Sequence, residues 1–90
     1  MIDFEWDETK ARSNKNKHDV SFFEATEVFS DEYAAYVRDP DHSHAEERYL
    51  VFGISVTEKY LVVSYTERYN IIRIISARHM TRQERKAYEQ

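Results

Sequence analysis

Basic side chains gather near the C-terminus of this chain, although the chain as a whole is acidic. They are Arg68, Arg73, Arg78, Arg82, Arg85 and Lys86, set against Glu84 and Glu89. A guanidinium group presents a planar fork of N–H donors that binds two phosphate oxygens at once. Several arginines on one surface are therefore typical of a phosphate-binding site. The alternative is a set of cross-strand Arg–Glu pairs, each contributing at most ~1 kcal/mol at a surface.

The distribution of charge says more than the formal net charge of −4. Segment 10–18 carries Lys10, Arg12, Lys15 and Lys17 and no acid, whereas segment 19–47 carries nine acidic residues and Arg38. Segment 68–90 is basic again. This pattern indicates two basic patches that could meet on one face, with an acidic flank elsewhere. Ordinary solvated surface is the alternative interpretation.

Length and composition limit the possible classes of protein. Ninety residues predict a single domain, 1–90, with a modest core. The chain has no cysteine, which excludes disulfides and thiolate metal sites. Neither an apolar leader nor a run near the ~20 apolar residues of a membrane span occurs. We expect a cytoplasmic protein without a membrane partner.

Helix starts are well marked in the sequence. A short strand in residues 2–6 is followed by Asp7, a suitable N-cap for a helix over 8–17. Ser21 with Glu24 forms a predicted capping box for a helix over 22–29. Thr81 with Glu84 forms another, which predicts a C-terminal helix within 82–90.

Between these helices the pattern has the period of β-strands. We expect strands at 33–39, 48–56, 60–67 and 71–77, the last three joined by short turns into an antiparallel meander. The fold class is therefore α+β, with an antiparallel four- to five-stranded sheet, two N-terminal helices and a C-terminal helix. Helices on one face of the sheet leave its other face free for a ligand or partner.

Arg73 lies in the middle of an otherwise apolar strand. Simple alternation places it on one face with Ile71 and Ile75, and places Ile72, Ile74, Ser76 and Arg78 on the other face. Because one face must be core, we expect Arg73 to face the open side. Arg78 follows the strand and can leave the core face at its exit.

Two further segments have side chains suited to ligands. "DPDHSHAEE" (39–47) offers carboxylates and imidazoles, but its spacing matches no standard metal loop, so we expect a solvated acidic loop and no metal. Lys17 and His18 end the first predicted helix. They either complement its dipole or bind phosphate.

The ordered set of motifs resembles the BrnT family of bacterial toxins over nearly the whole chain. These motifs are Phe4-Glu5-Trp6-Asp7, Asn14 with Lys17-His18, Val20-Ser21-Phe22, Glu47-Arg48, Thr66 with Arg68, Arg73-Ile74-Ile75-Ser76-Ala77-Arg78, and Thr81-Arg82 with Glu84-Arg85. Two departures are His79-Met80, where many relatives carry Lys-Ala, and Ser43-His44-Ala45, in a loop that often contains Gly.

The resemblance implies a RelE-like fold and a ribonuclease toxin of a type II toxin–antitoxin module that inhibits translation. It also implies a BrnA-type ribbon-helix-helix antitoxin, in an assembly of two toxin and two antitoxin chains. DNA would be contacted only indirectly, through the antitoxin. No cofactor is implied.

The implied reaction is metal-independent RNA cleavage, in which the 2′-hydroxyl attacks the adjacent phosphorus. The catalytic candidates are Arg68, Arg78, Arg82, Glu47 and Glu67. The candidates for holding the RNA are Lys17, His18, Arg48 and Arg73, with His18 also a candidate acid. The alternative function is a non-catalytic interaction module whose basic face binds an acidic partner. A metal-dependent enzyme built on the acidic loop would instead lose its activity in EDTA.

Overall fold

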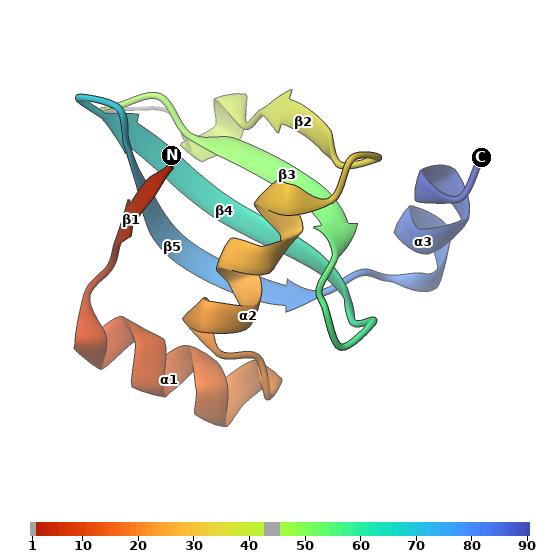
Figure 1. Cartoon of the computed structure of the whole chain (residues 1–90), viewed down its shortest axis with the longest axis horizontal. Coiled ribbons are helices and arrows are strands. Elements are labelled where there is room, and N and C mark those ends of the chain that lie inside the picture. The colour runs from red at the N-terminus through yellow and green to blue at the C-terminus, as the bar shows by residue number, and fades with distance from the viewer. Residues whose placement is uncertain (1, 43–45) are drawn as a thin grey trace.

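Five strands form one mixed sheet in the computed structural model, which describes residues 2–42 and 46–90 (Figure 1). The order across the sheet is β1-β5-β4-β3-β2, and β1 pairs with β5 in parallel while the other neighbours are antiparallel. The strands are β1 (Asp3–Glu5), β2 (Ala35–Arg38), β3 (Tyr49–Ile54), β4 (Tyr60–Arg68) and β5 (Ile71–His79). The predicted α+β class is confirmed.

The helices begin at the predicted caps. They are α1 (Glu8–His18), α2 (Phe22–Glu27) and α3 (Arg82–Tyr88), with short 3₁₀ turns η1 (Val28–Ser30) and η2 (Pro40–His42). The Asp7 carboxylate accepts a hydrogen bond from the backbone N–H of Lys10 at 3.0 Å. Both predicted capping boxes are present at α2 and α3. The second helix is shorter than expected, because its last turn tightens into η1.

Helices α1 and α2 cover one face of the sheet, and the core lies between them and the strands (Figure 1). Core residues are Val20, Phe22, Ala25 and Val28 before the sheet and Val51, Leu61, Val63, Tyr65, Ile74 and Ala77 within it. We call the opposite side of the sheet the open face. It carries Leu50, Phe52, Val62, Ser64, Thr66, Arg73, Ser76 and Arg78.

A β-bulge in β5 decides which side chains share the open face. Ser64 of β4 pairs with Ser76, but the next residue, Tyr65, pairs with Ile74, so one extra residue of β5 lies between these pairs. An extra residue reverses the alternation of the strand beyond it. Arg73 faces the open side as predicted, but the prediction that Arg78 lies on the other face is wrong.

A two-residue turn joins β4 to β5. Tyr69 and Asn70 both have positive φ, 50° and 68°. Two such residues give the two-residue turn that matches the twist of paired strands.

No helix in the described part of the chain is both long and apolar enough to cross a membrane.

Candidate functional site

Three arginines lie around the Glu46 carboxylate at one end of the open face. Arg68 binds this carboxylate through two hydrogen bonds, from Nε at 3.0 Å and from Nη2 at 2.8 Å. Arg73 donates from Nη1 to Oε2 of Glu5 at 3.0 Å, across the parallel β1–β5 pair. Arg48 precedes β3 and acts electrostatically on Glu46. We call Arg48, Arg68 and Arg73 with Glu5 and Glu46 the arginine cluster.

The charges of the arginine cluster keep Glu46 ionised. The hydrogen bond from Arg68 lowers the pKa of Glu46, and the charges of Arg68, Arg48 and Arg73 lower it further. The same pair raises the pKa of Arg68. Glu46 is therefore a carboxylate at neutral pH, able to accept a hydrogen bond or a proton but held by its cationic neighbours.

Arg78 extends the positive surface toward the other end of the open face. It forms a bidentate pair with Glu84 of α3, with N–O distances of 2.8 and 3.0 Å. Hydrogen bonding to Arg78 lowers the pKa of Glu84 to about 2. Five residues of strand separate Arg73 from Arg78, roughly 16 Å at ~3.3 Å per residue. The two arginines therefore suit different phosphates of one chain.

The remaining predicted site residues do not join the arginine cluster. Glu47 pairs with Arg38 of the edge strand β2. Glu67 pairs in register with Ile72 and so points to the same side as Tyr65, away from Arg68. Arg82 is the first residue of α3, next to the Arg78–Glu84 pair.

Lys17 and His18 lie at the C-terminal end of α1, on the covered side of the sheet. The expectation that the two basic patches share one face is therefore wrong.

Sequence analysis missed Glu5 and Glu46, because pairing β1 with β5 and the path of the 39–48 segment cannot be read from local patterns. One signal was present, because Glu46 and Arg48 are two positions apart and residues at this spacing in an extended segment point to the same side.

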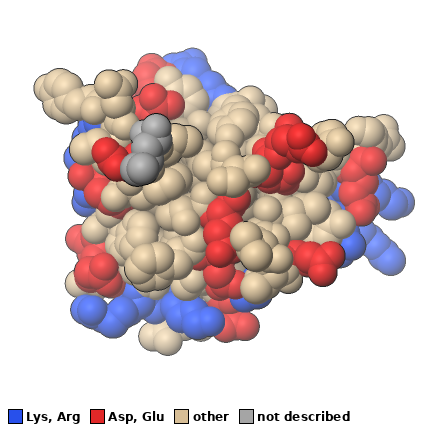
Figure 2. Space-filling view, viewed as in Figure 1, with Lys and Arg blue, Asp and Glu red and all other residues tan. Residues whose placement is uncertain are grey.

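The acidic segment 19–47 lies only partly apart from the arginine cluster, because Glu46 of this segment binds Arg68. Figure 2 shows Asp and Glu side chains across the middle of the α1–α2 side, with Lys and Arg along its rim. In the acidic loop, His42 Nδ1 lies 2.9 Å from Oδ2 of Asp39. Within the described residues no three His, Asp or Glu side chains gather closely enough to hold a metal ion. Ser43, His44 and Ala45 lie outside the described residues.

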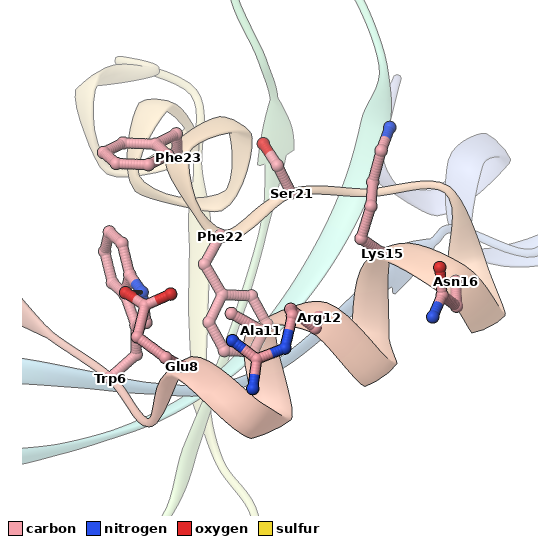
Figure 3. Close-up of a pocket in the computed structure, with 9 residues that line it drawn as sticks. All are labelled: Trp6, Glu8, Ala11, Arg12, Lys15, Asn16, Ser21, Phe22 and Phe23. Carbon is pink, nitrogen blue, oxygen red and sulfur yellow. Dashed lines mark hydrogen bonds between the residues drawn. The ribbon is translucent and has the colours of Figure 1, made fainter.

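A hollow lies between α1 and α2, away from the arginine cluster. Figure 3 shows the rings of Trp6, Phe22 and Phe23 facing it, with Arg12 and Lys15 of α1 at its rim. Trp6 and Phe23 pack edge to face with their centroids 5.1 Å apart, and Phe23 is 73% exposed. This hollow combines exposed aromatic surface with positive charge.

Comparison with known families identifies the chain. Residues 6–84 match the model of a family described as the ribonuclease toxin, BrnT, of type II toxin–antitoxin systems. The chain belongs to the BrnT family. This BrnT protein is thus a member of a family of ribonuclease toxins.

A solved structure supports the fold of this BrnT protein. The crystal structure at 1.1 Å of the ribonuclease toxin BrnT of Brucella abortus superposes with a TM-score of 0.66 at 20% sequence identity. The match covers 91% of this chain and 100% of the Brucella chain. No curated protein sequence matches this chain.

Proposed function

We propose that this BrnT protein is an endoribonuclease that cleaves RNA without a metal ion and so inhibits translation in the cytoplasm. The observation that carries the proposal is the bulge in β5, which places Arg78 on the same open face as Arg73 and its neighbours Arg68 and Arg48. An open, concentrated set of guanidinium groups is suited to a phosphodiester chain. Membership in a ribonuclease toxin family supports the same conclusion.

The arginine cluster supplies the groups for attack by the 2′-hydroxyl. The 2′-oxygen forms a bond to phosphorus while the bond from phosphorus to the 5′-oxygen breaks, which leaves a 2′,3′-cyclic phosphate and a 5′-hydroxyl. Arg68 and Arg73 stabilise the extra negative charge on the phosphorane oxygens. Glu46 accepts the proton of the 2′-hydroxyl, and water returns a proton to the leaving 5′-oxygen.

Other predicted residues act around this centre. Arg48 holds the attacked phosphate, and Arg78 and Arg82 hold phosphates further along the open face. Glu46 replaces Glu47 and Glu67 as the proposed base because its carboxylate lies among Arg48, Arg68 and Arg73, whereas Glu47 pairs with Arg38 of the edge strand and Glu67 points to the other side of the sheet. Lys17 and His18 contribute positive charge on the α1 side, where a longer RNA can reach them.

The test is RNA cleavage by the purified chain in EDTA, with the cyclic phosphate product detected by mass spectrometry. We expect Arg68→Gln and Glu46→Gln each to lower the cleavage rate about 10²-fold or more. Lys15→Gln is the matched control, because it also removes one exposed ion pair, with Asp19, but on α1. Cleavage that needs a divalent metal, or that survives in folded Arg68→Gln, contradicts the proposal.

We also propose that a BrnA-type ribbon-helix-helix antitoxin neutralises the toxin in an assembly of two toxin and two antitoxin chains. The edge strand β2 is exposed along its whole length and has β3 as its neighbour on one side. Such an edge accepts an added strand from a partner. Beside it, Val37 and Phe52 line an apolar hollow with Ala87 and Tyr88 of α3.

Co-expression followed by light scattering tests this assembly. We expect one complex with the mass of two toxin and two antitoxin chains, which binds promoter DNA through the antitoxin and no longer cleaves RNA. A complex that retains full cleavage contradicts neutralisation by the antitoxin, and a free chain that forms the complex but never cleaves RNA favours the non-catalytic interaction module instead. Ala35→Lys, which adds charge to the edge strand beside the same apolar hollow, should weaken the complex without lowering cleavage by free toxin.

A further inference from the structure

A groove of about 560 Å³ lies on the covered side of the sheet, at the end of β3 and β4 next to β2. Its size is within the range of small-molecule sites. The lining residues are Ile2, Phe29, Tyr36, Val37, Arg38, Tyr49, Tyr65, Glu67 and Ile72. We call it the tyrosine groove. It shares no lining residue with the arginine cluster.

Three tyrosines line the tyrosine groove, and Tyr36 is the one whose ring is well exposed to a ligand. Tyr49 and Tyr65 are stacked, with centroids 5.6 Å apart and ring planes 29° from parallel. Tyr36 is 52% exposed and packs against Phe29, with the two ring centroids 6.3 Å apart. Burial raises the pKa of Tyr65 to about 12, so its hydroxyl remains neutral. Burial also raises the pKa of Tyr36, so a planar base can stack on this exposed ring without meeting a charged phenolate.

Glu67 gives the tyrosine groove a specific polar group. The carboxylates of Glu5, Glu46, Glu47 and Glu84 each bind an arginine. Glu67 differs from them, because within residues 2–42 and 46–90 its carboxylate makes no hydrogen bond or ion pair. An ionised carboxylate has acceptor sites and no donor. It therefore selects a ligand edge that carries two adjacent N–H donors.

Guanine is the base with such an edge. Its N1–H and N2–H groups point the same way and can donate to both oxygens of one carboxylate. Adenine and cytosine offer one amino group beside an unprotonated ring nitrogen, and uracil offers one N–H between two carbonyls. The lone pairs of these ring nitrogens and carbonyl oxygens would repel the oxygens of a carboxylate.

The tyrosine groove and the arginine cluster are built on the same end of the sheet. Arg48 precedes Tyr49, Glu67 precedes Arg68, and Ile72 precedes Arg73, and neighbours along a strand point to opposite faces. An RNA strand that crosses this end can place phosphates at the arginines and one base in the groove. Building on the proposed ribonuclease function, we propose that the tyrosine groove binds a guanine base of the RNA.

Binding of non-cleavable RNA tests the proposal. The probe is a short fluorescent 2′-O-methyl oligouridylate that contains one guanosine, one inosine or one adenosine. We expect the guanosine oligomer to bind about 10-fold more tightly than the adenosine oligomer. Inosine, which lacks the N2 amino group, should bind with intermediate affinity.

Variants separate recognition from folding. Glu67→Gln should abolish the preference for guanosine. Tyr36→Leu should weaken binding of both purines about 10-fold, whereas Tyr36→Phe, which keeps the ring, should not. Tyr33→Leu is the matched control, because Tyr33 is 75% exposed and lies outside the groove.

Equal affinity for guanosine and adenosine overturns the proposal, as does a preference that survives in Glu67→Gln or the absence of oligomer binding. The probe has no free 2′-hydroxyl, so its binding does not depend on cleavage. A guanosine preference in a chain that never cleaves RNA refutes the ribonuclease function alone. Cleavage without any guanosine preference refutes the tyrosine groove alone.

Discussion

Replacing Glu84 by glutamine removes the anion that holds Arg78 against α3. In the wild type the pKa of Glu84 is about 2 rather than the ordinary 4.5, with the hydrogen bonds from Arg78 as the main cause. A depressed carboxyl pKa means that the ionised form favours the folded state. This stabilisation is complete above about pH 4.5 and is lost as the pH falls through about 2.

The magnitude follows from the two pKa values. The difference between 4.5 and about 2 corresponds to about 3 kcal/mol of unfolding free energy. The Arg78 side chain is 41% exposed, so solvent screening reduces this value. We expect Glu84→Gln to lower the free energy of unfolding by about 1–2 kcal/mol at pH 7. By about pH 2.5 the difference from wild type should have fallen below half.

Urea unfolding followed by circular dichroism at pH 7 and pH 2.5 measures this difference. Glu89→Gln, at the C-cap of the same helix, is the matched control, since Glu89 lies 3.8 Å from Arg85 and both side chains are about half exposed. It should cost less than about 0.5 kcal/mol. A Glu84→Gln protein as stable as wild type at pH 7, or a difference that is the same at both pH values, would refute this account of the pair.

Three further changes test the packing that supports the open face, each by urea unfolding at neutral pH. Asn14→Ala should cost about 2–4 kcal/mol, because the buried amide bonds both the N–H and the carbonyl of Ala77; a loss under about 1 kcal/mol would contradict this. Gly53→Ala should cost about 1–2 kcal/mol, because a Cβ there lies 3.2 Å from Oδ2 of Asp31; unchanged stability would show that this contact relaxes freely. Tyr88→Phe should cost about 1 kcal/mol through loss of the hydroxyl that donates to Asp31, and a more stable variant would argue against that bond.

Local signals in the sequence were enough for the elements. Asp7, Ser21 and Thr81 are capping residues whose hydrogen bonds lie within one turn of helix, so a short pattern predicts them. The alternation of apolar residues likewise located both ends of every strand to within two residues. These features depend on neighbours in sequence.

The site depended on contacts that a local pattern does not contain. Alternation predicted the face of Arg73, but the extra residue before Ser76 is visible only in the pairing with β4. Likewise Glu46 and Glu47 are equivalent as residue types, and the arginine that each one binds decides its role. Register and ion-pair choice are set by the assembled sheet, so sequence analysis could not predict that Arg73 and Arg78 share a face or which carboxylate each arginine binds.

The parallel pairing of β1 with β5 limits how early in folding the sheet can be completed. Glu5 of β1 pairs with Arg73 of β5, and these two residues are 68 positions apart in the chain. Contacts between such distant segments form late and slowly in folding. During synthesis, a chain released before β5 has neither a partner for its first strand nor Arg73 and Arg78. The arrangement of Arg73 and Arg78 on the open face is thus completed only after β5 has been synthesised and has paired with β1 and β4.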